Sequence, residues 1–165
     1  MAYTNSTQAR IVYDAALPTG LYDFIANVPS GSSKALQREI KKTFGLAGRF
    51  ETRNTNVLAL KAARNDASGL RPSAGQGDSR WLGNGEFSCQ NHPLSKVAPV
   101  LEAELGVPVM DETGMSGRFD FDLHWDEQEP RHNPEGLKQA LLDQLGLELV
   151  PTNLPVEMLI IEKTP

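Results

Sequence analysis

The stretch LGVPVMDETGMSGRFDFDLHWD, residues 105–126, contains a helix end, a short apolar segment, a glycine-marked turn and an alternating segment. Gly106 stands where a helix end favours the left-handed conformation that glycine adopts easily, and Val107 follows it back toward the core. Residues 118–126 alternate strictly between polar and apolar side chains, the pattern of a strand with one buried face. The stretch therefore predicts a helix followed by a hairpin.

Two other helical segments follow the same pattern. Counting back from a terminal glycine, apolar residues recur every four positions: Leu36, Ile40 and Phe44 before Gly45; Val97, Leu101 and Leu105 before Gly106; Leu137, Leu141 and Leu145 before Gly146. Such a ladder forms one buried helix face. Two strands joined by a turn are expected after each glycine, at residues 48–52 and 57–61, 107–110 and 118–125, and 147–150 and 156–161. Chance similarity is the alternative, since this spacing is common in α/β proteins.

Strands are also expected before the first two helices, at residues 22–28 and 86–90. The second half then follows the order β-α-β-β-α-β, a split β-α-β or ferredoxin-like arrangement. We therefore predict an α+β fold of repeated β-α-β-β units, with a mixed or antiparallel sheet and helices on one face. The segments would be an N-terminal extension (1–20), a first β-α-β-β unit (21–62), a Gly/Ser/Pro-rich loop or linker (63–85) and a second, β-α-β-β-α-β unit (86–163). Within the loop, Trp81 is expected to bury its ring.

Composition narrows the classes of function. The 165 residues are 39% hydrophobic and 22% charged, with a net charge of −5, as in an ordinary folded domain. This acidity argues against nucleic acid as a partner, because nucleic-acid binding needs clustered Lys and Arg. No segment is apolar and long enough to span a membrane. No phosphate loop or nucleophile elbow occurs, so we predict neither a cofactor nor a resident metal.

The alternating strand carries the strongest candidate for catalysis. Asp120, Asp122 and His124 share its polar face, and carboxylates with an imidazole can serve as metal ligands or as an acid–base pair. Positions two apart on a strand lie about 7 Å apart, however, so one ion would need further ligands such as His92 or His132. The simpler interpretation is the solvated face of a half-buried strand. A metal-dependent or acid/base hydrolase stays the alternative.

Two further features were weighed for chemistry. Cys89 shares a strand face with Phe87, which predicts a buried, unreactive thiol. The turn of residues 111–117 is rich in residues with direct geometric roles, because Asp and Thr side chains bond locally and glycine permits positive φ. This turn is longer than its two counterparts. If the protein has a binding site, the sequence places it here, on Asp111, Thr113, Gly114, Gly117 and Arg118.

The chain also resembles a large acidobacterial family of conserved hypothetical proteins, a domain of unknown function. The resemblance covers nearly the whole chain and is carried by residues 22–24 (YDF), 36–44 (LQREIKKTF), 57–60 (VLAL), 70–73 (LRPS), 106–123 (GVPVMDETGMSGRFDFDL), 140–141 (AL), 144–147 (QLGL) and 156–161 (VEMLII). Members usually begin further upstream with a signal peptide, and some carry the domain behind a membrane metallopeptidase of the β-lactam-sensor type. The present start therefore suggests a trimmed or shortened member.

The resemblance implies a periplasmic or secreted setting and brings no catalytic residues. Together with the residues themselves, it favours a non-catalytic binding or protein-interaction module of the cell envelope, whose partner would be a protein or another envelope component. An enzyme is the less favoured expectation.

Overall fold

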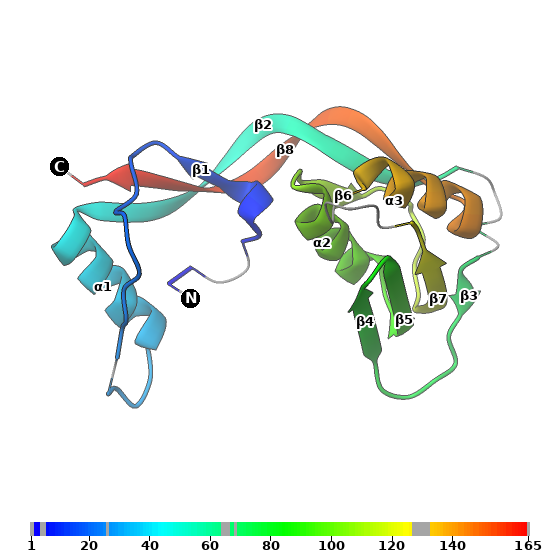
Figure 1. The fold of residues 1–165 in the computed structure, drawn as a ribbon, viewed down its shortest axis with the longest axis horizontal. Helices are drawn as coiled ribbons and strands as arrows, with labels where there is room; N and C mark the ends of the chain where they lie inside the picture. The colour runs from blue at the N-terminus through cyan, green and yellow to red at the C-terminus, as the bar shows by residue number, and fades with distance from the viewer. Residues whose placement is uncertain are drawn as a thin grey trace. The chain divides into compact units, whose positions relative to one another are not determined.

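The computed structural model describes residues 2, 3, 6–25, 27–63, 67, 69–126 and 133–164. Two sheets are present, with strand orders β1-β8-β2-β6 and β3-β7-β5-β4. The first is mixed, since β1 and β6 pair parallel with their neighbours, and the second is antiparallel. These findings confirm the α+β class (Figure 1). The elements, after a 3-10 turn at Gln8–Arg10, are β1 (Ile11–Tyr13), α1 (Ser32–Phe44), β2 (Leu46–Ala62), β3 (Arg71–Pro72), β4 (Ser79–Gly83), β5 (Glu86–His92), α2 (Leu94–Leu105), β6 (Val109–Asp111), β7 (Phe119–His124), α3 (Pro134–Ala140), a π-helical turn (Leu141–Leu145) and β8 (Leu147–Lys163).

The chain forms two compact units. Unit 1 comprises Met1–Thr55 with Leu154–Pro165, and unit 2 comprises Asn56–Asn153. Both β2 and β8 contribute residues to each unit. The segment scheme 1–20, 21–62, 63–85 and 86–163 stays a prediction. Among the described residues, no helix combines the length and apolar character that a membrane crossing requires.

The predicted helix ends are confirmed. Gly45, Gly106 and Gly146 each follow a helix with φ of 64°, 67° and 67°, in the left-handed region. Each glycine N–H donates to a carbonyl of the preceding turn, which satisfies an otherwise unpaired acceptor. The chain then returns to the interior at once after two of them, where Leu46 and Leu147 are buried.

Two of the predicted turns do not form. Residues 53–56 and 151–155 were read as turns because they contain Asn, Thr and Pro, yet β2 and β8 run through them as continuous 17-residue strands. In unit 2 the amide of Asn153 donates to the Oδ1 atom of Asn56 at 3.2 Å. Asn56 and Asn153, which suggested turns in the sequence, are therefore hydrogen-bonded through their exposed side chains from one strand to the other.

The ferredoxin-like repeat is not confirmed. Strands β6 and β7 were expected to form a hairpin, but β6 pairs with β2 in one sheet and β7 with β5 and β3 in the other. The strands of the second half are thus divided between two sheets. The strand expected at residues 22–28 does not form among the described residues, and Tyr22 and Ile25 there are 60% and 94% exposed. The predicted loop at 63–85 contains β3 and β4.

Unit 2 has a single hydrophobic core. Buried side chains of α2, α3 and the π-helical turn join those from one face of β5 and β7. Phe119, Phe121 and Leu123 point into this core, and Phe87 meets Phe121 edge to face at 5.3 Å between ring centroids. The predicted alternation of β7 is therefore confirmed. The opposite face of the β3-β7-β5-β4 sheet carries the polar residues of these strands, and we call it the polar face.

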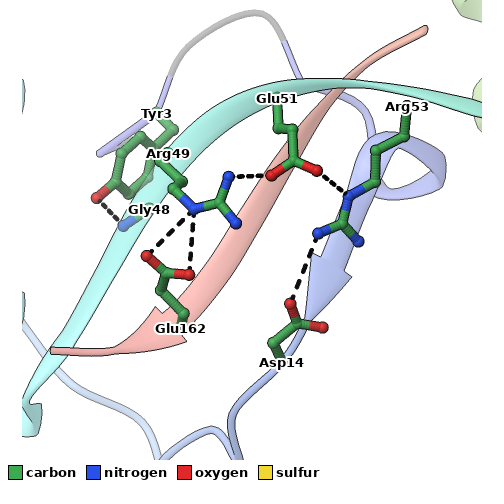
Figure 2. Close-up of polar contacts among 7 residues, drawn as sticks. All are labelled: Tyr3, Asp14, Gly48, Arg49, Glu51, Arg53 and Glu162. Atoms are coloured by element: carbon green, nitrogen blue, oxygen red, sulfur yellow. Dashed lines mark hydrogen bonds and ion pairs between the residues drawn. The ribbon is translucent and has the colours of Figure 1, made fainter. Parts of the chain in front are cut away.

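Unit 1 contains a chain of ion pairs on its strands (Figure 2). Arg49 contacts both Glu51 and Glu162, and Glu51 also accepts from Arg53 at 2.6 Å. Arg53 in turn lies 3.9 Å from Asp14. Hydrogen bonds from Arg53 and Arg49 lower the pKa of Glu51 to about 2. The network ties β2 to β8 and to the residue after β1.

Candidate functional site

A polar pocket of about 230 Å³ lies in unit 2, where the loop between β3 and β4 meets β5 and β7. It is smaller than the roughly 300–1,000 Å³ of sites for drug-sized ligands. Its lining residues are all polar or glycine, so they offer hydrogen bonds to a ligand. The lining residues are Ser73, Gly75, Gln76, Gly77, Asp78, Ser79, Gln90, Asn91 and Asp120. We call it the Asn91 pocket.

Asn91 organises the wall of this pocket. The register between β5 and β7 shifts between Cys89 and His92, which pair with Phe121 and Phe119, so β5 carries one extra residue. Asn91 absorbs this bulge with a φ of 57°, in the left-handed region that few residues other than glycine and asparagine adopt. Its side chain accepts from the Nε atom of Arg118 at 2.8 Å and donates to the carbonyl of Gly77. Both ends of its amide are therefore engaged.

Two carboxylates line the pocket, and each is held by neighbours. Asp120 accepts the backbone N–H of Asn91 at 2.7 Å, and this bond and one from the Ser73 hydroxyl lower its pKa. Asp78 lies 3.6 Å from the Nζ atom of Lys96 and 3.9 Å from the Nη2 atom of Arg118. Two cationic side chains thus partly compensate the charge of Asp78, and hydrogen bonds hold Asp120 in place.

The remaining polar contacts order the loop. The backbone N–H of Ser73 donates to the carbonyl of Arg118 at 2.8 Å, and the Ser73 hydroxyl accepts the N–H of Gly75 at 3.2 Å. Ser79 donates to Gln90 across β4 and β5 at 3.3 Å. Hydroxyl, amide and carboxylate groups thus stand at defined positions around a concave space. Such a site can bind a small polar ligand by several hydrogen bonds.

The structure separates the residues of the hydrolase hypothesis. Asp120 lines the pocket, whereas Asp122 and His124 lie further along β7 and do not. Hydrogen bonds from Ser88 and from Arg71, at 3.1 Å, lower the pKa of Asp122. His92 is 8% exposed and takes a place on the core side of β5. His132 lies outside the described residues.

Catalytic features are sparse in the described part of unit 2. There and in the rest of the described chain, no three His, Cys, Asp or Glu side chains are grouped so that they could hold a metal ion. The thiol of Cys89 is 2% exposed, and burial raises its pKa to about 11, which confirms the predicted inert cysteine.

The turn of residues 112–118 contains most of the binding residues that the sequence suggested. Asp111 Oδ1 accepts from the backbone N–H of Thr113 at 3.1 Å and from its hydroxyl at 2.7 Å, and these bonds fix the turn. Gly114 and Gly117 have φ of 67° and 118°, which explains their residue type. Of this group, only Arg118 contacts residues of the Asn91 pocket.

Sequence reasoning missed most of the pocket. Ser73, Gln76, Asp78 and Ser79 lay in a segment read as a loop, Gln90 ended the strand predicted at residues 86–90, and Asn91 followed it. Asparagine at a strand end was the available signal, because it tolerates the left-handed conformation. The prediction for Trp81 was wrong: its side chain is 56% exposed on β4, while Leu82 packs against the core.

Comparison with known proteins identifies a family but no activity. No curated protein and no solved structure matches the chain significantly. One family pattern, described as "protein of unknown function (DUF3738)", matches residues 14–164, which is nearly the full length. The match agrees with the resemblance to a domain of unknown function seen in the sequence. The chain belongs to the family of proteins of unknown function DUF3738.

Proposed function

We propose that this protein is a non-catalytic binding module of the cell envelope and that the Asn91 pocket is its binding site. The observation that carries the proposal is the conformation of Asn91. Non-glycine residues in the left-handed region are uncommon, and residues held in such conformations cluster where a ligand is bound. Here the bulge also aims a backbone N–H at Asp120 and shapes the pocket wall.

Binding has more support than hydrolysis. A general acid needs a carboxyl whose pKa is raised toward neutrality, but hydrogen bonds lower the pKa of both Asp120 and Asp122. Both carboxylates are therefore charged at neutral pH and act as hydrogen-bond acceptors. The serine hydroxyls of the lining have no histidine beside them among the lining residues. The envelope location is supported by the family resemblance, whose members begin with signal peptides.

Fragment screening by NMR tests the pocket. Amide spectra of the full chain would be recorded with a library of small polar compounds containing monosaccharides, amino acids, short peptides and dicarboxylates. We expect shifts confined to residues 73–79, 90–91 and 120. The Gln90→Leu variant should remove them, because it takes an amide from the pocket while keeping a similar side-chain volume. A Gln139→Leu variant on α3 is the control, since Gln139 lies outside the lining.

Two results would contradict the proposal. The first is that no fragment of any class shifts the pocket amides. The second is that the protein converts a fragment chemically and that the Asp120→Asn variant stops this conversion. The location is tested by osmotic-shock fractionation of the source cells. We expect the protein either in the fraction that contains periplasmic markers or in the culture medium. Recovery with cytoplasmic markers alone would refute an envelope role.

A further inference from the structure

Trp81 is the unexplained residue of the polar face. In unit 2, among the described residues, it is the one large apolar side chain that is exposed, at 56%. Its neighbour Leu82 already attaches β4 to the core, so the tryptophan contributes little to packing. An exposed indole is unfavourable in water, yet it offers a flat surface with a polar N–H. Burial on a ligand would recover that free energy.

The strand register places Trp81 beside the Asn91 pocket. Ser79 and Trp81 are two positions apart on β4, so they face the same side about 7 Å apart. Ser79 lines the pocket and pairs with Gln90, while Trp81 pairs with Ser88. The Cζ2 atom of Trp81 lies 3.8 Å from the position of a Cβ atom on Gly83, so the ring extends along the strand toward Gly83 and away from Ser79. The pocket and the indole therefore lie on the same face, with the indole beyond Ser79.

The polar groups beside Trp81 continue those of the pocket. Ser88, which pairs with Trp81, pairs in turn with Asp122 on β7. Asp122 lies 3.1 Å from the Nη2 atom of Arg71, so its charge is partly compensated. The Ser88 hydroxyl is therefore next to the indole across the strands, and the Asp122–Arg71 pair lies further across the same face.

One ligand class uses both features together. Sugar rings present C–H groups on one face, which pack on the electron-rich face of an indole, and hydroxyls at the edge. An Asp carboxylate can accept hydrogen bonds from two neighbouring sugar hydroxyls, and a Gln amide can accept from one hydroxyl and donate to the next. The pocket volume of about 230 Å³ suits one ring, and Trp81 supplies a platform for another ring of the same chain.

We propose that the Asn91 pocket and Trp81 together bind a neutral oligosaccharide, one ring in the pocket and another ring of the same chain stacked on the indole. This inference rests on the proposed binding function and names its ligand class. A nucleic acid fits poorly, because Asp120, Asp122 and Glu86 share the face and would repel phosphates. A peptide added to the free edge of β4 is the main competing occupant.

Titration of the full chain with defined oligosaccharides tests the proposal. The probes are tetrasaccharides of glucose with β-1,4 or α-1,4 linkage, the β-1,4 tetramer of N-acetylglucosamine, and an uncrosslinked peptidoglycan glycan strand. Binding would be measured by calorimetry and by amide shifts. We expect at least one probe to shift residues 73–83, 90–91 and 120–122, and a tetramer to bind more tightly than its monomer.

Substitutions at the indole provide the specific readout. Trp81→Ala should weaken binding by about tenfold or more, whereas Trp81→Phe should restore most of it, because the aromatic face remains. Phe50→Ala in unit 1 is a matched control, since Phe50 is 49% exposed but lies outside the site. Both tryptophan variants should unfold at the wild-type denaturant concentration, since the side chain is largely exposed.

The outcomes separate this inference from the proposed function. Sugar binding that is unaffected by Trp81→Ala overturns the platform. If no carbohydrate binds while other fragments shift the pocket amides, the ligand class is wrong and the binding function stands. A peptide that protects the β4 amides, with no sugar bound, would identify strand addition instead. No binding of any probe or fragment overturns both proposals.

Discussion

Replacing Asn91 should reveal how much free energy the bulge stores. Asn91→Ala removes the hydrogen bonds to Arg118 and Gly77, worth about 0.5–1.5 kcal/mol each. Alanine in the left-handed conformation adds about 1–2 kcal/mol of strain. The free energy of unfolding of unit 2 should therefore fall by about 2–5 kcal/mol. The bond from the backbone N–H to Asp120 is unaffected, because it does not depend on the side chain.

The matched variant is Asn91→Gly. It loses the same side-chain bonds but has no strain at a φ of 57°. Glycine also raises the entropy of the unfolded chain, which destabilises the folded state by about 0.4–1 kcal/mol and offsets part of the stability gained from the relief of strain. We therefore expect Asn91→Gly to be more stable than Asn91→Ala by about 0.5–1 kcal/mol.

Urea unfolding followed by tryptophan fluorescence measures this difference. Both tryptophans, Trp81 and Trp125, lie in unit 2, so their emission reports that unit. With an m value of about 1–3 kcal/mol per molar urea, the two midpoints should differ by a few tenths of a molar. Equal midpoints, or a more stable alanine variant, would refute the left-handed bulge and with it the basis of the candidate site.

Substitutions at two sites and one titration probe other parts of the chain. Glu102 is fully buried and accepts the backbone N–H of Val109 at 3.0 Å, so Glu102→Ala should destabilise unit 2 by about 2–4 kcal/mol in the same urea assay, and Glu102→Gln by less. Gly69→Ala would bring a Cβ atom into steric overlap with the carbonyl oxygen of Gln144 and should lower the melting temperature or prevent folding. Glu51, with its pKa lowered from 4.5 to about 2, should stabilise unit 1 above pH 4.5 and lose that effect as the pH falls toward 2, which carboxyl NMR titration can follow.

Each of these predictions has a control within the chain. Glu104→Ala on α2 should change stability little, since Glu104 is only partly buried. Gly75→Ala should be tolerated, because the added Cβ atom would lie 3.5 Å from its nearest neighbour, the Ser73 hydroxyl oxygen. Arg53→Gln should raise the pKa of Glu51, since the bond from Arg53 is the largest cause of its shift. A Glu51 carboxyl that titrates near 4.5 in the wild-type protein would contradict the network in Figure 2.

Local patterns in the sequence predicted the features that depend on neighbours along the chain. The three glycine helix ends and the alternation of β7 were correct, because capping and strand alternation are decided within a few residues. Pairing between distant strands was not predicted. Asn56 and Asn153 suggest turns when each is read alone, and only their pairing across β2 and β8 makes continuous strands of both segments.

The same limit applies to the candidate site. Asp120 was identified because a regular strand displays its polar residues openly in the sequence, and Arg118 because it ends the glycine-rich turn. Trp81 was misplaced, since nothing local decides whether Trp81 or Leu82 faces the core when the strand partner is unknown. Asn91 was missed because a bulge is a relation between two strands and leaves only a weak local signal.

The extra residue in β5 explains why a pocket exists on this face. Ser88 pairs with Asp122 and Cys89 with Phe121, so an unbroken register would bring Asn91 opposite Phe119 on the buried side. The bulge gives that buried place to His92, which is 8% exposed, and releases Asn91 toward Asp120, Arg118 and the loop. A flat polar face would otherwise result. The buried histidine is then part of the same displacement, which gives it a structural role.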